Sequence, residues 1–214
     1  MSDFLKNIED SFKPISKRID TIDIREFQHL FGTDKFPKGK IIEIFGKAGV
    51  GKSTLCLKMI KKLQEKYITL LVDSEFSFDK VYAHKLGVDL DSCIFSNDLR
   101  FFSNVFFTSK IDVIVIDSII GLNLTKTQWA EFVTKIHKLG ICVIIVNQIR
   151  TDIKRRKTVS AQYRTFTKDV DLQLKLINKL QIKKGYNIVG HTVYTQVTKN
   201  KLTGNLPASL FIIN

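Results

Sequence analysis

The most constraining feature of this 214-residue sequence is a glycine-rich segment at positions 46–53, which reads Gly-Lys-Ala-Gly-Val-Gly-Lys-Ser. It follows a short apolar run, Ile41–Phe45, and leads into Lys52–Lys66, where apolar residues recur at the spacing of one helix face. The pattern G-x-x-x-x-G-K-[ST] between a strand and a helix is typical of a phosphate-binding loop. The segment therefore predicts a strand–loop–helix unit, which is a building block of α/β folds.

The residue types in this loop suit the binding of a nucleoside triphosphate. Glycines let backbone N–H groups approach phosphate oxygens without a Cβ in the way, and the N-terminus of the following helix adds partial positive charge. We expect Lys52 to reach the β- and γ-phosphates and Ser53 to hold Mg²⁺. A glycine-rich turn without a ligand is the alternative. The candidate nucleotide-binding residues here are Gly46, Lys47, Ala48, Gly49, Val50, Gly51, Lys52, Ser53 and Thr54.

Apolar and amphipathic stretches alternate along the rest of the chain. Three more apolar runs predict buried strands: Ile68–Val72, Val113–Ile116 and Ile141–Val146. Two amphipathic stretches predict further helices: Asp79–Leu86 and Thr127–Leu139. This alternation indicates a mainly parallel, twisted sheet with helices on both faces. In the last third, Leu172–Leu176 and Val193–Val197 alternate apolar and polar residues and, with Leu210–Ile213, predict antiparallel strands that extend the sheet.

The turn signal Pro37-Lys38-Gly39 divides the chain into two expected parts. Residues 1–36 predict a helix and strand appendage, and residues 37–214 predict the core. The longest apolar run is too short to span a bilayer, and the first ten residues lack the apolar region of a signal peptide. Three widely spaced cysteines, Cys56, Cys93 and Cys142, suit reduced thiols. We therefore expect a cytoplasmic protein that has no membrane partner.

The charge is strongly positive, with 34 Lys and Arg against 21 Asp and Glu, a formal net charge of +13. Such a field attracts polyanions, most often nucleic acid, although acidic membranes and proteins are alternatives. Seven cations and one carboxylate, Asp152, fall within positions 150–168, together with two aromatic residues. Cations along a backbone and rings that stack on bases favour single-stranded DNA over a merely solvated loop. The candidate DNA-binding residues are Arg150, Lys154, Arg155, Arg156, Lys157, Tyr163, Arg164, Phe166 and Lys168.

A carboxylate, Asp117, directly follows the apolar run Val113–Ile116. Parallel α/β sheets bind ligands at the carboxyl ends of their strands. We therefore expect Asp117 to act with Ser53 at the Mg²⁺ site, the alternative being a carboxylate that only caps the next segment.

Several further segments, in order along the chain, resemble bacterial RecA recombinases. They are Val72–Glu75, Asp79–Asp89, Asn147–Arg150 and Lys199–Lys201, and the resemblance extends from about Pro37 to Ile213. It implies a RecA-like P-loop NTPase core with ATP and Mg²⁺ as ligands. The basic segment 150–168 stands where the family has its second DNA-binding loop.

The resemblance also implies catalytic roles for individual residues. Glu75 matches the carboxylate that activates the attacking water, and Gln148 matches the sensor of the γ-phosphate. With Lys52, these form the expected catalytic set. The alternatives are a solvated loop carboxylate at Glu75 and a polar strand end at Gln148.

Four more residues match ligand contacts of the family. Asp79 and Tyr82 match the adenine contacts, the alternatives being a helix N-cap and a packed ring. Lys199 and Lys201 match lysines that reach the ATP of the neighbouring subunit, the alternative being a solvated strand or turn.

The sequence departs from the family in three ways. Only thirty positions separate Asp117 from Asn147, fewer than the family has around its first DNA loop. The basic segment is not glycine-rich, and the family's C-terminal domain has no counterpart in the sequence. We therefore expect a minimal core, whose compactness and basicity suit a phage or mobile-element recombinase.

The expected function is that of a DNA-dependent ATPase that binds single-stranded DNA and forms head-to-tail filaments, with residues 1–36 hooking onto the next subunit. It would promote homologous pairing, strand exchange or annealing. A non-exchanging paralogue that mediates recombination and a hexameric helicase motor are the two alternatives.

Overall fold

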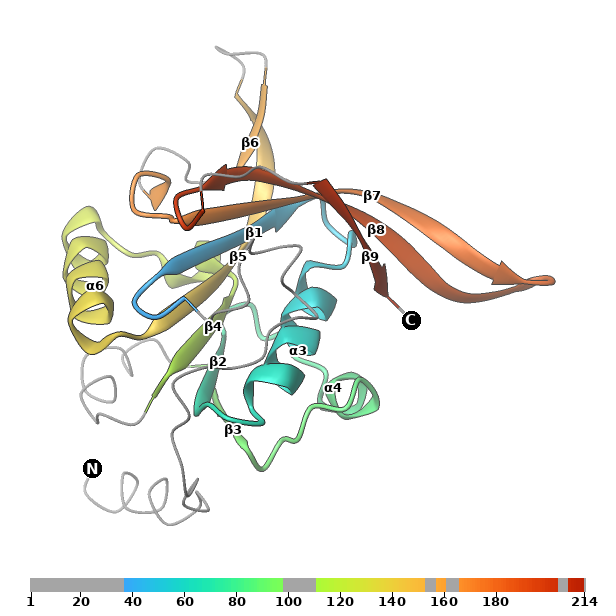
Figure 1. Cartoon of the computed structure of the whole chain (residues 1–214), viewed down its shortest axis with the longest axis horizontal. Helices are drawn as coiled ribbons and strands as arrows, with labels where there is room; N and C mark the ends of the chain where they lie inside the picture. Colours follow the sequence, from blue (N-terminus) through green and yellow to red (C-terminus); the bar gives the residue numbers. More distant parts are fainter. Residues whose placement is uncertain (1–36, 98–110, 153–156, 161–165, 204–207, 214) are drawn as a thin grey trace.

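The computed structural model describes residues 37–97, 111–152, 157–160, 166–203 and 208–213. In these ranges the strands form one mixed sheet in the order β3-β2-β4-β5-β1-β7-β8-β9, with β6 paired to β5 (Figure 1). The expected appendage at residues 1–36 lies outside the described residues, as do Lys154, Arg155, Arg156, Tyr163 and Arg164.

Six neighbouring strands run parallel to one another: β3 (Cys93–Ser96), β2 (Thr69–Asp73), β4 (Val113–Asp117), β5 (Cys142–Asp152), β1 (Ile41–Gly46) and β7 (Leu172–Lys184). At the C-terminal end of the sheet, β8 (Asn187–Asn200) pairs antiparallel with β7, and β9 (Ala208–Ile213) pairs antiparallel with β8. The expected mixed α/β sheet is therefore confirmed. The expected antiparallel pairing in the last third is also confirmed, between β7 and β8 and between β8 and β9. On its other side β7 pairs parallel with β1, which its alternating pattern does not reveal because that pattern reflects the environments of the two faces and not the strand direction.

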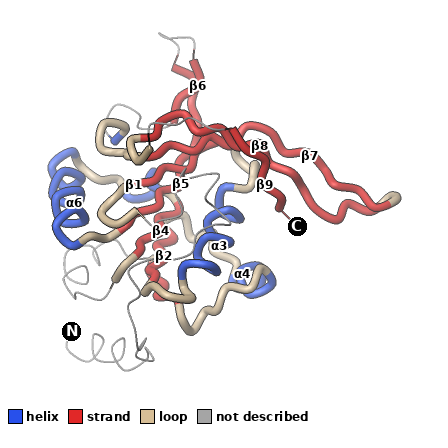
Figure 2. Tube along the Cα trace, viewed as in Figure 1, coloured by secondary structure: helices blue, strands red, loops and turns tan. Residues whose placement is uncertain are grey.

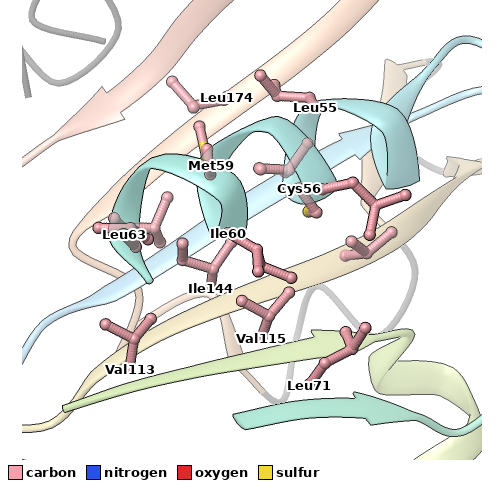
Figure 3. Close-up of a cluster of buried hydrophobic side chains, with 14 of the residues drawn as sticks. Leu55, Cys56, Met59, Ile60, Leu63, Leu71, Val113, Val115, Ile144 and Leu174 are labelled. Carbon is pink, nitrogen blue, oxygen red and sulfur yellow. The ribbon is translucent and has the colours of Figure 1, made fainter. Parts of the chain in front are cut away.

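Helices cover both faces of the sheet. Helix α3 (Lys52–Leu63) packs on one face, where its buried side chains meet Val113, Val115, Ile144 and Leu174 (Figure 3). Helix α6 (Lys126–Leu139) packs on the other face with Trp129, Phe132 and Ile136. Two separate clusters form because successive strand residues point to opposite faces, so that Val113 and Val115 face α3 while Ile114 and Ile116 face α6.

The helix boundaries follow the local sequence signals. Helix α6 begins after Thr125, whose hydroxyl accepts the N–H of Gln128 in a capping box, and ends at Gly140 with φ 69°. The short helix α4 (Lys80–Lys85) begins after Asp79, and the 3₁₀ helix η3 (Ile119–Leu122) follows β4.

Cys56 and Cys142 are buried, and Cys93 is half-buried. No helix in the described ranges is both long and apolar enough to cross a membrane.

Strand β5 does not end at Val146, as the apolar run predicts, but continues to Asp152. Beyond the sheet it pairs with β6 (Lys157–Ser160) in an antiparallel hairpin, shown as the upper projection in Figures 1 and 2. Part of the basic segment is thus regular structure. Its polar sequence hides this, because backbone pairing between two strands needs no apolar side chains.

Candidate nucleotide-binding site

The phosphate loop joins β1 to α3 at the carboxyl edge of the sheet. Gly49 and Gly51 have φ values of 68° and 102°, which favour glycine. At Gly46 an added Cβ would lie 2.7 Å from the carbonyl oxygen of Leu176 on β7, so this position has no room for a side chain. No side chain caps the first turn of α3, which leaves its N–H groups facing the loop.

Lys52 lies folded over this loop and is only 8% exposed. Its Nζ donates to the carbonyl oxygens of Gly46 at 3.2 Å and Lys47 at 2.9 Å. Burial lowers the pKa of Lys52, while the carboxylates of Asp117 and Glu75 act in the opposite direction. The ammonium group is therefore placed at the centre of the loop, where a bound phosphate would pair with it.

Ser53 and Asp117 meet from α3 and β4. Burial raises the pKa of Asp117, and the nearby carboxylates of Glu75 and Asp73 raise it further, while a hydrogen bond with Ser53 lowers it. A cation beside Asp117 would favour its charged form and relieve this repulsion. One carboxylate, one hydroxyl and substrate phosphates make a donor set that Mg²⁺ accepts. The residues present therefore fit the expected metal.

Glu75 lies between a residue that directly follows β4 and a residue within β5. The hydroxyl of Ser118, after β4, donates to Glu75 Oε1. From β5, Gln148 Nε2 lies 3.5 Å from the same oxygen. The sheet thus brings Glu75 and Gln148 together although 73 positions separate them. Sequence reasoning missed Ser118, whose only signal is its place directly after Asp117.

Asp73 is a second residue that sequence reasoning missed. It is 4% exposed at the end of β2, and its carboxylate accepts the N–H groups of Ser77 at 3.1 Å and Phe78 at 2.8 Å. These two bonds close the turn that carries Glu75. The signal was local, since Asp and Asn side chains commonly accept backbone N–H groups a few residues on.

Asp79 and Tyr82 line one cavity with Ser53 and Asp117, beside the phosphate loop. Asp79 also caps α4, accepting the N–H of Tyr82 at 2.9 Å, so the capping alternative is observed. Tyr82 Oη lies 3.1 Å from Thr54 Oγ1, which ties α4 to α3. Their position beside the loop suits an adenine contact, which stays a prediction.

The aromatic residue Phe166 does not lie where base stacking requires it. Its ring is 5% exposed and packs edge-on against Trp129, with centroids 4.4 Å apart. The turn that carries Phe166 folds onto α6, because Trp129 Nε1 donates to Asp169 Oδ2 at 2.8 Å. The expected DNA contact of Phe166 is therefore wrong, and the ring belongs to the core. Lys168, two positions further, is exposed.

Phe166→Ala is expected to lower the free energy of unfolding by about 3–5 kcal/mol, as a buried phenyl ring leaves a cavity. Denaturant unfolding of the variant and of the parent protein checks this. DNA affinity measured well below the unfolding transition should change little. A stable variant with much weaker DNA binding would return Phe166 to the DNA surface.

Lys199 and Lys201 lie far from the phosphate loop of their own chain. Lys201 N–H donates to the carbonyl of Asp171, and Asp171 N–H donates to the carbonyl of Ile41 at the start of β1. Strand β1 then runs from Ile41 to Gly46, about 16 Å at 3.3 Å per residue. Lys201 therefore lies at the opposite edge of the sheet from the phosphate loop, and Lys199 precedes it by two residues on β8, where it pairs with Gln173.

Both lysines contact the backbone at the end of the basic segment. Lys199 Nζ donates to the carbonyl of Thr167, and Lys201 Nζ donates to the carbonyl of Lys168 at 2.9 Å. Burial and the charge of Lys201 lower the pKa of Lys199, while Asp171 and Glu43 act in the opposite direction. Lys199 is half-buried, while Lys201 is exposed in a turn, as the solvated alternative describes. The role of both lysines at a neighbouring ATP stays a prediction.

Comparison with known proteins agrees with this arrangement. The sequence model of the RecA N-terminal domain matches residues 15–128. Curated relatives include Protein RecA of Mesomycoplasma hyopneumoniae strain 7448, 31% identical over 202 residues that cover 80% of this chain and 59% of the relative. Protein RecA of Agrobacterium fabrum is 31% identical, with 80% of this chain and 55% of the relative covered.

This chain thus spans less than two thirds of the length of these relatives. The family match nevertheless covers more than half of the chain, and it includes the phosphate loop, Glu75 and Asp117. The described strands form the mixed sheet, mostly parallel with antiparallel C-terminal strands, that the resemblance implies. The chain belongs to the RecA family.

Proposed function

We propose that this protein is an ATP-dependent recombinase that binds single-stranded DNA, assembles head to tail, and hydrolyses ATP faster when DNA is bound. One observation carries the proposal. Strand β5 is continuous from the core to Asp152, so that Gln148, next to Glu75, and the basic hairpin beyond it share one strand. A change at the γ-phosphate side of Gln148 would therefore act directly on the hairpin.

The site residues divide the chemistry among them. Lys52 would neutralise the β- and γ-phosphates, and Glu75 would accept the proton of the attacking water. Ser118 and Gln148, both directed at Glu75 Oε1, would hold that carboxylate in place. Mg²⁺, held by Ser53 and Asp117, would supply charge neutralisation on the phosphates.

Gln148 would exchange its amide contact between Glu75 and the γ-phosphate. In the ATP state its side chain would reach the phosphate and set the position of the hairpin, and hydrolysis would remove that contact. DNA bound to the hairpin would then favour the ATP state by linkage. Pairing, strand exchange or annealing would follow from this ATP-dependent hold on DNA.

Head-to-tail assembly would explain why the phosphate loop and the two late lysines lie at opposite edges of the sheet. The phosphate loop lies at the carboxyl edge, and Lys199 and Lys201 lie at the amino edge. Translation of one copy along a filament would bring the lysines of one subunit toward the nucleotide of the next. The site of each subunit would then be complete only in the assembly.

The proposal is tested by fluorescence anisotropy with labelled single-stranded DNA. Affinity should be highest with a non-hydrolysable ATP analogue, lower with ADP and lowest without nucleotide. If seven cations contact phosphates, log K should fall with log[salt] at a slope of about −5. Equal affinity in all three nucleotide states would overturn the coupling, and closed six-membered rings in electron micrographs would favour a helicase.

Gln148→Ala is expected to separate nucleotide binding from DNA binding. ATP affinity should stay within about twofold, while the ATP-over-ADP preference in DNA affinity should fall at least about tenfold, the lower end of the range for a hydrogen bond to a charged group. Gln181→Ala on the exposed part of β7 is the matched control. If the Gln148→Ala protein kept the parental ATP-over-ADP preference, Gln148 would have no part in sensing the nucleotide.

A further inference from the structure

A carboxylate that the proposed chemistry does not use is buried beneath the site. Glu43 lies in the middle of β1 and is 4% exposed. Asn147 Nδ2 on β5 donates to Glu43 Oε1 at 2.7 Å, and Gln173 Nε2 on β7 donates to Glu43 Oε2 at 2.5 Å. Asn147 and Gln173 are themselves 2% and 6% exposed. We call these three residues the amide cluster.

The amide cluster spans the three central strands of the sheet. Gln173 stands directly opposite Glu43 in the β1–β7 register. On the other side, β5 places Ile145 opposite Glu43, so Asn147 is its diagonal neighbour. A buried carboxylate is unfavourable unless hydrogen bonds satisfy it, and leucine or isoleucine would fill these positions more easily. Packing alone therefore does not explain why these three polar residues occupy the centre of the sheet.

The carboxylate of Glu43 has an effect that an amide or hydroxyl group would not have. Both of its oxygens accept hydrogen bonds, one from Asn147 and one from Gln173, so the NH₂ group of Asn147 faces it. The other end of the same amide, Asn147 Oδ1, must then face the N–H of Gln148, which donates to it at 2.9 Å. Glu43 thus selects one of two orientations of Asn147, and that orientation fixes the backbone of Gln148.

The cluster also extends toward the opposite side of the molecule. Gln173 pairs in register with Lys199 on β8. Burial lowers the pKa of Lys199, and the charge of Glu43 weakly opposes that shift. One carboxylate therefore bears on the strand that carries Gln148 and on the strand that carries Lys199.

We infer that Glu43 is a positioning residue, which fixes the orientation of Asn147 and through it the backbone of Gln148 for nucleotide sensing. The sensing part of this inference rests on the proposed function. The orientation part rests on the amide cluster alone.

Glu43→Gln is the variant that tests the inference with little change in shape. A glutamine side chain both donates and accepts, so both orientations of Asn147 become possible. Hydrogen exchange at the Gln148 amide should become at least about threefold faster, as its acceptor is lost in part of the molecules. The ATP-over-ADP preference in DNA affinity should fall about three- to tenfold, the range expected for one hydrogen bond.

Glu43→Gln/Gln173→Glu supplies the rescue. With the carboxylate moved to position 173, the amide introduced at position 43 must donate to it and must offer its oxygen to Asn147. The original orientation of Asn147 returns, so amide exchange and nucleotide preference should recover to within about twofold of the parent. Glu131→Gln on the exposed face of α6 controls for the loss of one negative charge.

The outcomes separate the inference from the proposed function. A parent protein whose DNA affinity does not depend on the nucleotide would overturn the proposed function. Amide exchange at Gln148 would then still test whether Glu43 fixes the orientation of Asn147. Unchanged exchange in Glu43→Gln, or a double variant no better than the single one, would overturn the inference. Loss of thermal stability with both readouts unchanged would show that the cluster only stabilises the core.

Discussion

Lys52→Ala is expected to reduce ATP hydrolysis about 10²–10³-fold, the range for loss of one preorganised group that stabilises developing charge. The ammonium group is held over the loop by two backbone carbonyls and lies among the carboxylates of the site. Without it, those carboxylates would repel the triphosphate and weaken its binding as well. Steady-state phosphate release and titration with a fluorescent ATP analogue measure the two effects.

Lys61→Ala is the matched control for this variant, because Lys61 lies on the exposed side of the same helix, α3. The control should hydrolyse ATP at the parental rate. If Lys52→Ala kept full ATP-dependent DNA pairing, ATP would be only a structural ligand, and the recombination mediator would be the better interpretation.

Lys52→Ala also gives a test of head-to-tail assembly. Its subunits keep Lys199 and Lys201, while a Lys199→Ala/Lys201→Ala protein keeps the phosphate loop. When the two inactive proteins are mixed at equal amounts and assemble in random order, an interface is active only if an intact phosphate loop meets intact lysines. About a quarter of the interfaces should therefore be active. No recovery in the mixture, with filaments visible by electron microscopy, would argue that the lysines act within their own chain.

Glu75→Gln is expected to lower hydrolysis about 10²–10⁴-fold while ATP binding is retained. Glutamine can still accept hydrogen bonds from Ser118 and Gln148, but it cannot take a proton from water. Because hydrolysis is blocked after ATP binding, complexes with single-stranded DNA should last longer than those of the parent protein. Single-turnover hydrolysis and dissociation of labelled DNA check the two expectations.

Glu65→Gln, at an exposed carboxylate that pairs with Lys62 beyond the end of α3, is the control for Glu75→Gln. It should leave both rates unchanged. Near-parental hydrolysis in Glu75→Gln would mean that another group activates the water, and the role implied by the family resemblance would have to be abandoned.

Local sequence signals predicted much of the fold. The glycine-rich segment and the apolar residues after it marked β1 and α3, and Leu55, Met59, Ile60 and Leu63 are buried as their spacing requires. Prediction from the sequence pattern failed where the polarity of the side chains does not reveal which strands pair with one another. It missed the short strand β3, the regular pairing of β5 with β6, and the parallel pairing of β7 with β1.

The candidate site residues divide in the same way, into those that a local pattern identifies and those that it does not. Lys52 and Ser53 belong to one contiguous motif, and Asp117 directly follows an apolar run, so composition and spacing were enough to select them. Phe166 was misassigned because an aromatic residue in a basic segment has the same signature whether it stacks on a base or packs against a tryptophan. Ser118 and Asp73 carry no signature beyond their neighbours in sequence.

What these 214 residues specify locally is a phosphate loop between a strand and a helix, with a cationic segment further on, because backbone conformation and charge depend on adjacent residues. Sheet register alone decides that Gln148 meets Glu75, that Glu43 joins β5 to β7, and that Lys199 lies at the far edge. Those contacts join positions 73, 104 and 130 residues apart. They form because burying the apolar faces of the parallel strands against α3 and α6 permits only one alignment.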